Sequence, residues 1–168
     1  MRLSKDFFIR DVLEVAPLLI GKVIVRKLED GTELRGRITE TEAYRGIEDT
    51  ACHARMGKTA RNAVMFGDGG AAYVYLCYGI HNLLNIVTGT MGDPQAVLIR
   101  CTQENNGPGK LTKALQIDRS FNGVDVTESD VIYIEDDGME AEYTTAPRVG
   151  IDYASKEDRE RLWRYIKK

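Results

Sequence analysis

The sequence predicts an α+β fold in one domain, built around an antiparallel β-sheet. A length of 168 residues suits one domain with a core of ordinary size. Short segments with the apolar alternation of strands outnumber helical ones. Several of these strand-like segments are joined by turn residues typical of β-hairpins. We therefore expect residues 1–168 to fold as a single domain of mixed composition.

The first third of the chain should hold one helix, one hairpin and one long loop. Asp11 can cap a helix that runs through Leu19, and Gly21 can end it. Residues 29–32 (EDGT) have the turn chemistry of a hairpin. The loop is polar, rich in glycine and aperiodic, and loops of that length are usually functional. The expected elements are a helix over 11–19, strands over 22–28 and 33–44, and a loop over 45–70.

The rest of the chain should add several strands and two helices. Gly107 and Pro108 mark the start of one helix, and Ser155 with Asp158 three residues later resembles a capping box. Residues 136–138 (DDG) are a hairpin signal between two strand-like segments. The expected elements are strands over 72–78, 82–88 and 96–102, a helix over 108–117, a hairpin of 131–135 with 140–145, and a helix after Ser155.

Composition narrows the range of functions. The net charge is −3, but residues 125–142 hold eight acids and no Lys or Arg, so basic residues predominate elsewhere. A protein with basic residues on one face and acidic residues on the opposite face can bind DNA. The three cysteines, Cys52, Cys77 and Cys101, have the spacing of neither a disulfide framework nor a metal site, so we expect no metal and no cofactor. The charged N-terminus and the lack of long apolar runs indicate a cytoplasmic protein.

The segment RITETEAY, residues 37–44, carries acids on a strand-like pattern. Alternation places Glu40, Glu42 and Tyr44 on one side of the strand. Carboxylates near a strand end, beside a long loop, lie where a general base would be useful. The same pattern also fits an exposed face with solvated acids. The segment taken alone leaves both interpretations open.

A tyrosine-rich segment, YVYLCYG at residues 73–79, follows the long loop. Tyr73 and Tyr75 share one face, and Tyr73 is expected in the core. Tyr78 falls at a hairpin tip, where an exposed ring can stack on bases or wedge into a duplex. Asn85 could read a base edge through hydrogen bonds, although a structural amide is the alternative.

Cations cluster in two places that suit phosphate. Arg55, Lys58 and Arg61 lie in the long loop, and Lys110 lies in the first turn of the predicted helix. The segment GPGKLTK at 107–113 lacks the spacing of a phosphate-binding loop for nucleoside triphosphates. Solvated surface charge is the alternative interpretation.

Seven segments, in this order, resemble the alkyladenine (3-methyladenine) DNA glycosylase family. Together they cover nearly the whole chain, which makes the resemblance far more specific than any single motif. The segments are ETEAY at 40–44, the AxH pattern at 51–53, RxGKTxRNxxMFG at 55–67, YVYxxYGxHxxxN at 73–85, AVLIR at 96–100, NGPGKLTKAL at 106–115 and RVGIDYA at 148–154.

The resemblance implies a base-excision-repair enzyme with a curved, mostly antiparallel sheet, short flanking helices and a protruding β-hairpin. Such an enzyme flips alkylated or deaminated purines out of duplex DNA, at a cost of a few kcal/mol. A Glu-activated water then hydrolyses the N-glycosidic bond and leaves an abasic site. The ETEAY strand holds no lysine that could form a Schiff base, so hydrolysis without strand cleavage is expected. The implied partner is damaged double-stranded DNA, bound by a monomer without a cofactor.

The resemblance also implies a role for each matched residue. Glu42 would be the general base, and Arg100 would help to hold the water and the carboxylate. Asn85 would exclude normal guanine by crowding its exocyclic amine, and Tyr78 would fill the gap left by the flipped base. The remaining assignments are the base pocket for Tyr44, His53 and Tyr75, and the DNA backbone for Arg55, Lys58, Arg61 and Lys110. Glu40 receives no role.

Two departures from the family pattern and two other functions also bear on the interpretation. The family usually continues past the strand-like segment at 163–166 into a short terminal segment, whereas this sequence stops at Lys168. Between AVLIR and NGPGK the family carries a longer stretch, which is here reduced to residues 101–106, so DNA contacts could be trimmed. A hydrolase of free nucleosides would use the same acid and aromatic pocket but would need no wedge such as Tyr78. A non-catalytic module that binds damaged or single-stranded nucleic acid would leave Glu42 without a role.

Overall fold

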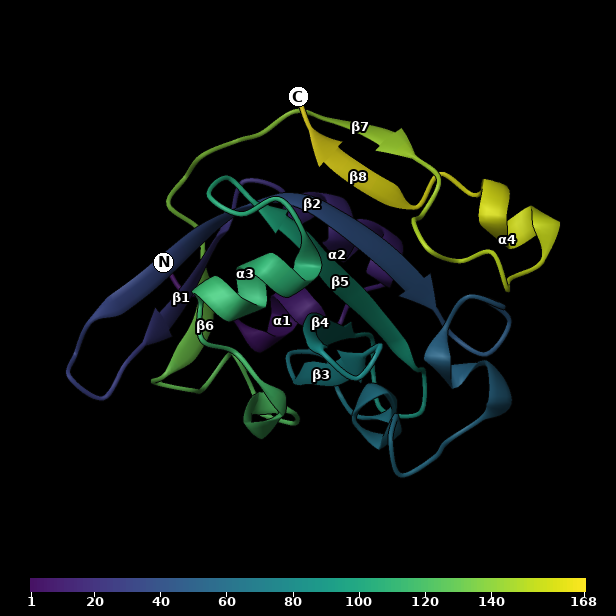
Figure 1. Cartoon of the computed structure of the whole chain (residues 1–168), viewed down its shortest axis with the longest axis horizontal. Helices are drawn as coiled ribbons and strands as arrows, with labels where there is room; N and C mark the ends of the chain where they lie inside the picture. Colours follow the sequence, from purple (N-terminus) through teal and green to yellow (C-terminus); the bar gives the residue numbers. More distant parts are fainter.

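A curved, eight-stranded antiparallel sheet forms the centre of the molecule in a computed structural model of residues 1–168 (Figure 1). The main path of the sheet runs β3-β4-β5-β2-β1-β6, and a β7–β8 pair attaches to β2 through β8. The α+β class and the antiparallel sheet are therefore confirmed. The strands are β1 Val23–Lys27, β2 Glu33–Arg45, β3 Ala72–Cys77, β4 His81–Thr88, β5 Gln95–Thr102, β6 Ile132–Glu135, β7 Tyr143–Ala146 and β8 Arg164–Lys167.

Short helices flank this sheet, and their starts follow the predicted caps. The Asp11 carboxylate accepts a hydrogen bond from the backbone N–H of Leu13 at 2.9 Å, and the Ser155 hydroxyl accepts one from the N–H of Asp158 at 3.2 Å. None of the helices has the length and apolar character needed to cross a membrane. The helices are α1 Lys5–Phe8, α2 Val12–Leu18, α3 Pro108–Ala114 and α4 Lys156–Glu160, with 3₁₀ turns η1 His53–Met56, η2 Ala63–Phe66 and η3 Arg119–Phe121. Neither α1 nor the two turns inside the long loop were expected from the sequence.

The two largest buried clusters hold these elements together. The larger has 23 residues and joins α1, α2 and α3 to the sheet, with Phe8, Val12 and Leu19 fully enclosed. Burying a large apolar side chain contributes roughly 1.5–3 kcal/mol. The smaller cluster packs Met65 of the long loop against Tyr73 of β3. The long loop is thereby fixed over the end of the sheet near β3.

Strand β2 is the longest strand and organises the sheet. Its first half pairs with β1, and its second half pairs with β5 and β8. Its pairing with β5 shifts register on both sides of Glu40. One shift leaves Arg100 of β5 as an extra residue between the partners Cys101 and Ile99. Bulges of this kind re-aim a side chain, and they are frequent next to active sites.

The predicted hairpin of residues 131–135 with 140–145 is wrong. Strand β6 pairs with β1, whereas β7 pairs with β8. The DDG turn itself does form, since the Asp136 carboxylate accepts from the N–H of Gly138 at 2.8 Å. However, Asp136 lies 2.7 Å from Lys22 and Asp137 lies 2.6 Å from Arg37. These ion pairs tie the turn to the β1–β2 end, and the chain leaves it toward β8 instead of returning along β6.

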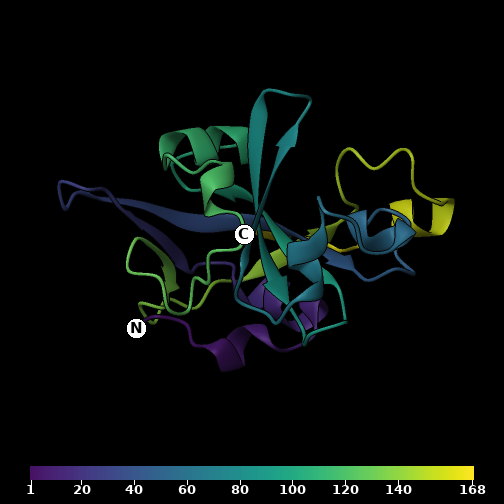
Figure 2. The ribbon, with the colours of Figure 1, turned by 90° about the horizontal axis from the view of Figure 1, so that it is seen from below.

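The two hairpins that the sequence predicted on either side of the long loop are confirmed, and both project from the body (Figure 2). In the β3–β4 hairpin the register runs from Ala72 opposite Ile86 to Cys77 opposite His81. Its turn has positive φ at both central residues, 51° at Tyr78 and 69° at Gly79, which is the type I′ pattern. Tyr78 is 90% exposed. The protruding hairpin therefore presents an aromatic ring at its tip.

Candidate active site

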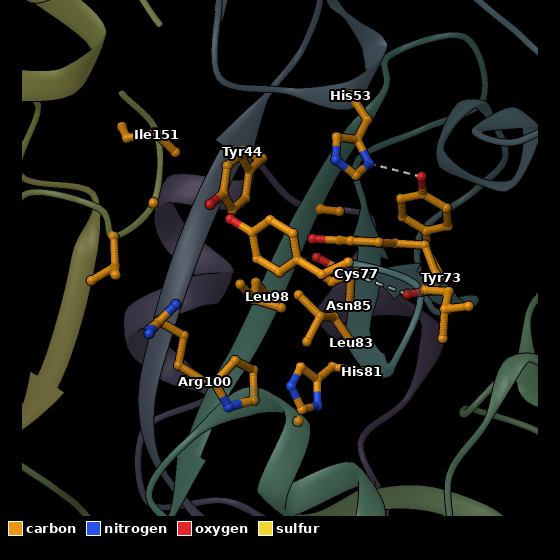
Figure 3. A pocket seen from close by; sticks show the side chains of 18 of the residues that line it. Tyr44, His53, Tyr73, Cys77, His81, Leu83, Asn85, Leu98, Arg100 and Ile151 are labelled. Atoms are coloured by element: carbon orange, nitrogen blue, oxygen red, sulfur yellow. Dashed lines mark hydrogen bonds between the residues drawn. The ribbon is translucent and has the colours of Figure 1, made fainter. Parts of the chain in front are cut away.

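A cavity of about 730 Å³ opens between the β3–β4 hairpin, strands β2 and β5, the start of α3 and the segment 149–153 (Figure 3). This volume lies within the range of small-molecule sites. Most of the side chains singled out in the sequence meet here. Those that line the cavity are Tyr44, His53, Arg61, Tyr75, Tyr78, Asn85, Arg100 and Lys110.

Aromatic rings from two elements, η1 and β3, form one wall of the cavity. The ring centroids of His53 and Tyr75 are 4.5 Å apart, and those of Tyr73 and Tyr75 are 5.4 Å apart. The Nδ1 atom of His53 lies 2.9 Å from the Tyr73 hydroxyl. Burial raises the pKa of Tyr73 to about 12 and also raises the pKa of Tyr75. Partial burial of His53, with the nearby charge of Arg61, lowers its pKa. The wall is therefore uncharged at neutral pH.

Asn85 comes from β4 and lies between this aromatic wall and β5. It is 4% exposed, and its Nδ2 atom donates to the backbone oxygen of Tyr73 at 3.1 Å. Its neighbour across the sheet is Leu98, which also lines the cavity. Asn85 is therefore a structural amide, one of the two interpretations of the sequence, and its side chain also lines the cavity. The hydrogen bond to Tyr73 sets the orientation of the amide.

Glu42 is fully buried behind the cavity wall and is held from three sides. One carboxylate oxygen accepts from the Tyr44 hydroxyl at 2.7 Å, and the other accepts from the backbone N–H of Val149 at 2.7 Å. The Nε atom of Arg100 lies 3.6 Å from the second oxygen. Burial raises the pKa of Glu42, while Arg100, the Val149 N–H and the Tyr44 hydroxyl oppose that shift. The carboxylate is thus fixed in direction, and its pKa lies above the usual range.

Glu40 lies beside Glu42 and is paired with two arginines. One of its oxygens is 3.1 Å from Nε of Arg100 and 3.1 Å from Nη1 of Arg164. The Cys101 thiol donates to the other oxygen at 3.3 Å. The Glu40 side chain is 14% exposed. The interpretation of this strand as a solvated acidic face is therefore wrong, because Glu42 and Glu40 both lie inside a network of contacts.

The four predicted phosphate-contacting cations divide into two groups. Arg61 and Lys110 line the cavity, and the guanidinium of Arg61 lies 5.7 Å from the centroid of the Tyr75 ring. Arg55 and Lys58 are exposed on the long loop and do not line the cavity. None of the four forms an ion pair with a carboxylate, whereas most other cations of the chain do. Their charge therefore remains available to a ligand.

A model of the family described as methylpurine-DNA glycosylase matches residues 6–105 and 102–168. The chain belongs to this family. A relative from Methanocella arvoryzae is 46% identical over 99% of this chain and 92% of its own length. Relatives from Borreliella afzelii and Desulfitobacterium hafniense are 41% and 42% identical over 97% and 98% of this chain, and over 94% of each relative. All three carry the provisional name 3-methyladenine DNA glycosylase.

The match to the methylpurine-DNA glycosylase family is divided into two parts just after β5. The alignment with the Methanocella relative spans 186 positions, so that relative holds residues that this 168-residue chain lacks. The two parts of the family match meet at 102–105, where the shortening was predicted. Here the backbone N–H groups of Thr102 and Asn105 each donate to the carbonyl of the other, at 2.9 and 3.2 Å. This tight turn joins β5 directly to α3 and brings Lys110 to the mouth of the cavity.

The segment 148–154 holds site residues to which the sequence assigned no role. Val149 bonds Glu42 through its backbone, and Tyr153 lines the cavity and donates to the carbonyl of Ala51 at 2.8 Å. Arg148 forms a buried ion pair with Asp49. The resemblance of RVGIDYA to the family was a signal for this segment. It could not show the Val149 contact, because every residue except proline supplies a backbone N–H.

Proposed function

We propose that the protein is a DNA glycosylase that removes damaged purines from duplex DNA by hydrolysing the N-glycosidic bond. The observation that carries the proposal is the placement of Glu42. It is a fully buried carboxylate with a raised pKa, held by Tyr44 and Val149 at the back of an aromatic cavity. A binding module would have no need of such a group. We also propose that the enzyme acts as a monomer.

The aromatic cavity would hold the flipped base. Stacking of a base on an aromatic ring contributes about 1–3 kcal/mol. Alkylated purines such as 3-methyladenine carry positive charge, and the uncharged faces of Tyr44 and Tyr75 attract cations. Asn85 would crowd the exocyclic amine of normal guanine, since its amide is fixed by the hydrogen bond to Tyr73. Damaged bases are also cheaper to unpair, which adds to the selectivity.

Glu42 would act as the general base in the bond-breaking step. Cleavage of this bond passes through an oxocarbenium-like state, which a nearby carboxylate stabilises while it takes a proton from the attacking water. A raised pKa suits a base that works near neutral pH. Arg100 would help to hold the water and the carboxylate. We assign Glu40 the task of orienting Arg100, because it binds the Nε atom and leaves the terminal nitrogens free for other partners.

The surface around the cavity would meet the duplex. Tyr78 projects at the hairpin tip, where it can occupy the gap that a flipped nucleotide leaves. The unpaired cations at the cavity mouth and on the long loop would contact phosphates, Arg61 and Lys110 nearer the base, Arg55 and Lys58 farther along the backbone. The acidic segment 125–142 is occupied in part with internal ion pairs at the β1–β2 end. The net charge of −3 is thus compatible with DNA binding.

We propose that the enzyme is monofunctional, which means that it releases the base without cleaving the strand. Lys110 is the residue on which this can be tested. Lys110 is the one lysine that lines the cavity. A lysine that attacks the sugar would form a Schiff base and permit strand cleavage. Glu42 is far better enclosed than Lys110, which is exposed. We therefore expect water, activated by Glu42, to be the nucleophile.

The test uses duplexes with one hypoxanthine or one ethenoadenine, an undamaged duplex and the free nucleosides. We expect base release from a damaged duplex only, and strand breaks only after alkali treatment. Binding without release from any lesion would support the non-catalytic module. Faster cleavage of free nucleosides than of duplex would support a nucleoside hydrolase. Trapping of a protein–DNA adduct by borohydride, lost in Lys110→Gln, would overturn the monofunctional assignment.

A further inference from the structure

We propose that the buried Arg148–Asp49 ion pair is a positioning device that fixes the groups around Glu42 for catalysis. The inference rests on the proposed function and deepens it. It concerns residues 99 positions apart in the sequence that meet directly behind the cavity. Neither touches the cavity, and both act through their neighbours.

The ion pair has a rigid, two-pronged geometry. Nη1 of Arg148 lies 2.6 Å from one Asp49 oxygen, and Nη2 lies 2.9 Å from the other. The side chains are 0% and 1% exposed. Fork-like pairs of this kind add directional specificity to their charge attraction. The guanidinium plane is therefore fixed in position and in orientation.

Arg148 contacts the two residues that follow Glu42 along the strand. Its Nη1 atom donates to the carbonyl of Ala43 at 2.9 Å, and its guanidinium carbon lies 4.9 Å from the centroid of the Tyr44 ring. Tyr44 is the residue whose hydroxyl bonds Glu42. The next residue in the chain after Arg148 is Val149, whose N–H bonds the other Glu42 oxygen. Both hydrogen bonds to Glu42 are thus placed through Arg148.

The pair is anchored on its other sides to two separate elements. Asp49 accepts from the backbone N–H groups of Arg45 and Ala51, each at 3.0 Å, which fixes the start of the long loop. Arg148 also lies 5.0 Å from the Trp163 ring centroid and donates to the carbonyl of Asp158 at 3.3 Å. The device therefore ties β2, the long loop and the C-terminal segment to one point.

Stability alone is a weak reason to place an ion pair here. Removing two charges from water is costly, and well-packed apolar residues often stabilise a fold equally well. In addition, Nε of Arg148 is buried without a hydrogen-bond partner, which adds to the cost. An apolar pair could not supply the same geometry, because it offers neither a directed hydrogen bond to the Ala43 carbonyl nor an oriented guanidinium over the Tyr44 ring.

The charge of Arg148 also acts on Glu42 directly. It lowers the pKa of Glu42, against the effect of burial. Arg100 from β5 and Tyr44 from its own strand also face Glu42. Glu40 shares Arg100 with Glu42, and Asp49 neutralises part of the charge of Arg148. Loss of the arginine charge should therefore raise the pKa of Glu42 further.

The test compares Arg148→Lys, Arg148→Gln and Asp49→Asn with the control Arg161→Lys. Arg161 is well matched, because it stacks on the same Trp163 ring at 4.7 Å and pairs with Asp158, yet it makes no contact near Glu42. Lysine keeps the positive charge but lacks the planar pair of donors with which arginine binds both carboxylate oxygens. We expect Arg148→Lys to lower the single-turnover rate about 100-fold, as misplacement of a catalytic group does. The half-saturating concentration of lesion duplex should change less than about threefold.

The pH profile separates positioning from a merely structural role. In Arg148→Gln the acid limb of the rate profile should move to higher pH, and in the control it should not move. A rate for Arg148→Lys within about twofold of wild type, with the protein folded by circular dichroism, would overturn the inference. If Arg148→Gln does not fold, Arg148→Lys and Asp49→Asn still test the inference. A lowered single-turnover rate with an almost unchanged half-saturating concentration of duplex supports positioning.

Failure of the inference can be told apart from failure of the proposed function. If wild type releases no base, the proposed function fails, and the inference is then judged on the Glu42 carboxyl itself. A ¹³C NMR titration of Glu42 in the free protein should show a higher pKa in Arg148→Gln than in wild type. An unchanged titration would overturn the inference whatever the enzyme activity.

Discussion

The two protruding hairpins of this protein share one supersecondary structure and differ in the chemistry of their tips. At the tip of β1–β2, the Asp30 carboxylate accepts from the N–H of Thr32 at 2.9 Å, and the turn residues are polar and exposed. At the tip of β3–β4, Tyr78 is 90% exposed and Ile80 is 72% exposed. The polar groups at the first tip are well solvated by water. The apolar side chains at the second tip would instead be stabilised by burial against a partner.

The cations near the two hairpins also differ, because those near β1–β2 have carboxylate partners and those near β3–β4 have none. Near β1–β2, Lys22 and Arg37 are paired with Asp136 and Asp137, and Arg35 is paired with Glu33 and Glu135. Near β3–β4, the cations Arg61 and Lys110 have no carboxylate partner. The same scaffold thus carries one end whose cations are paired within the chain and one end whose cations are left for a ligand. Substitutions at the two ends test this contrast.

The largest effect is expected from the two glutamates at opposite ends of β2. Replacement of a general base costs about 10²–10⁴-fold in rate. Glu42→Gln should therefore lose base release by that factor under single-turnover conditions, while binding to lesion duplex persists. Glu33→Gln, at the β1–β2 end of the same strand, should keep the wild-type rate. Equal rates for Glu42→Gln and wild type would show that Glu42 is not the base.

The second effect concerns the hairpin tips themselves. Tyr78→Ala should weaken binding to a lesion duplex about 5- to 150-fold, which corresponds to the loss of about 1–3 kcal/mol of stacking. Tyr78→Phe keeps the ring and should bind almost as wild type does. Asp30→Ala, at the other tip, should leave the dissociation constant unchanged. Unchanged binding by Tyr78→Ala would refute the assignment as a wedge.

The third effect is on the salt dependence of binding. Lys58→Gln with Lys110→Gln removes two unpaired cations and should reduce the slope of log Kd against log salt by about 2. Lys27→Gln with Arg35→Gln removes two cations that already have acidic partners. That second pair should change the slope little. Fluorescence anisotropy over a salt series measures both, and equal slopes for the two double variants would contradict the contrast.

The smallest expected effect is a shift in the pH at which the single-turnover rate falls on the acid side of its pH profile. Glu42 must be ionised to act as a base, and burial raises its pKa, so the inactive protonated form persists to higher pH than for an ordinary glutamate. The single-turnover rate should fall about tenfold per pH unit below that midpoint. The ratio of the dissociation constants of Tyr78→Ala and wild type should stay constant across the same range. An acid limb at the usual glutamate pKa would contradict the effect of burial on Glu42.

Local features of the structure were predictable because they depend on neighbouring residues. The cap of Asp11, the cap of Ser155 and the turn of the β3–β4 hairpin all follow from contacts within a few positions. The aromatic residues of the cavity were predictable from a different source, the ordered resemblance to a known family. The hairpin of 131–135 with 140–145 failed because its local turn was correct but distant ion pairs set the path of the chain.

Most of the side chains that line the cavity, the turns of the two projecting hairpins and the family could be predicted from the sequence alone. Tertiary structure alone decided that Glu42 is buried, that a bulge aims Arg100 at Glu40, and that Val149 bonds the carboxylate through its backbone. The physical reason is the nature of these contacts. Backbone donors and register shifts leave no residue-type signal, and the Arg148–Asp49 pair joins positions that only the folded chain brings together.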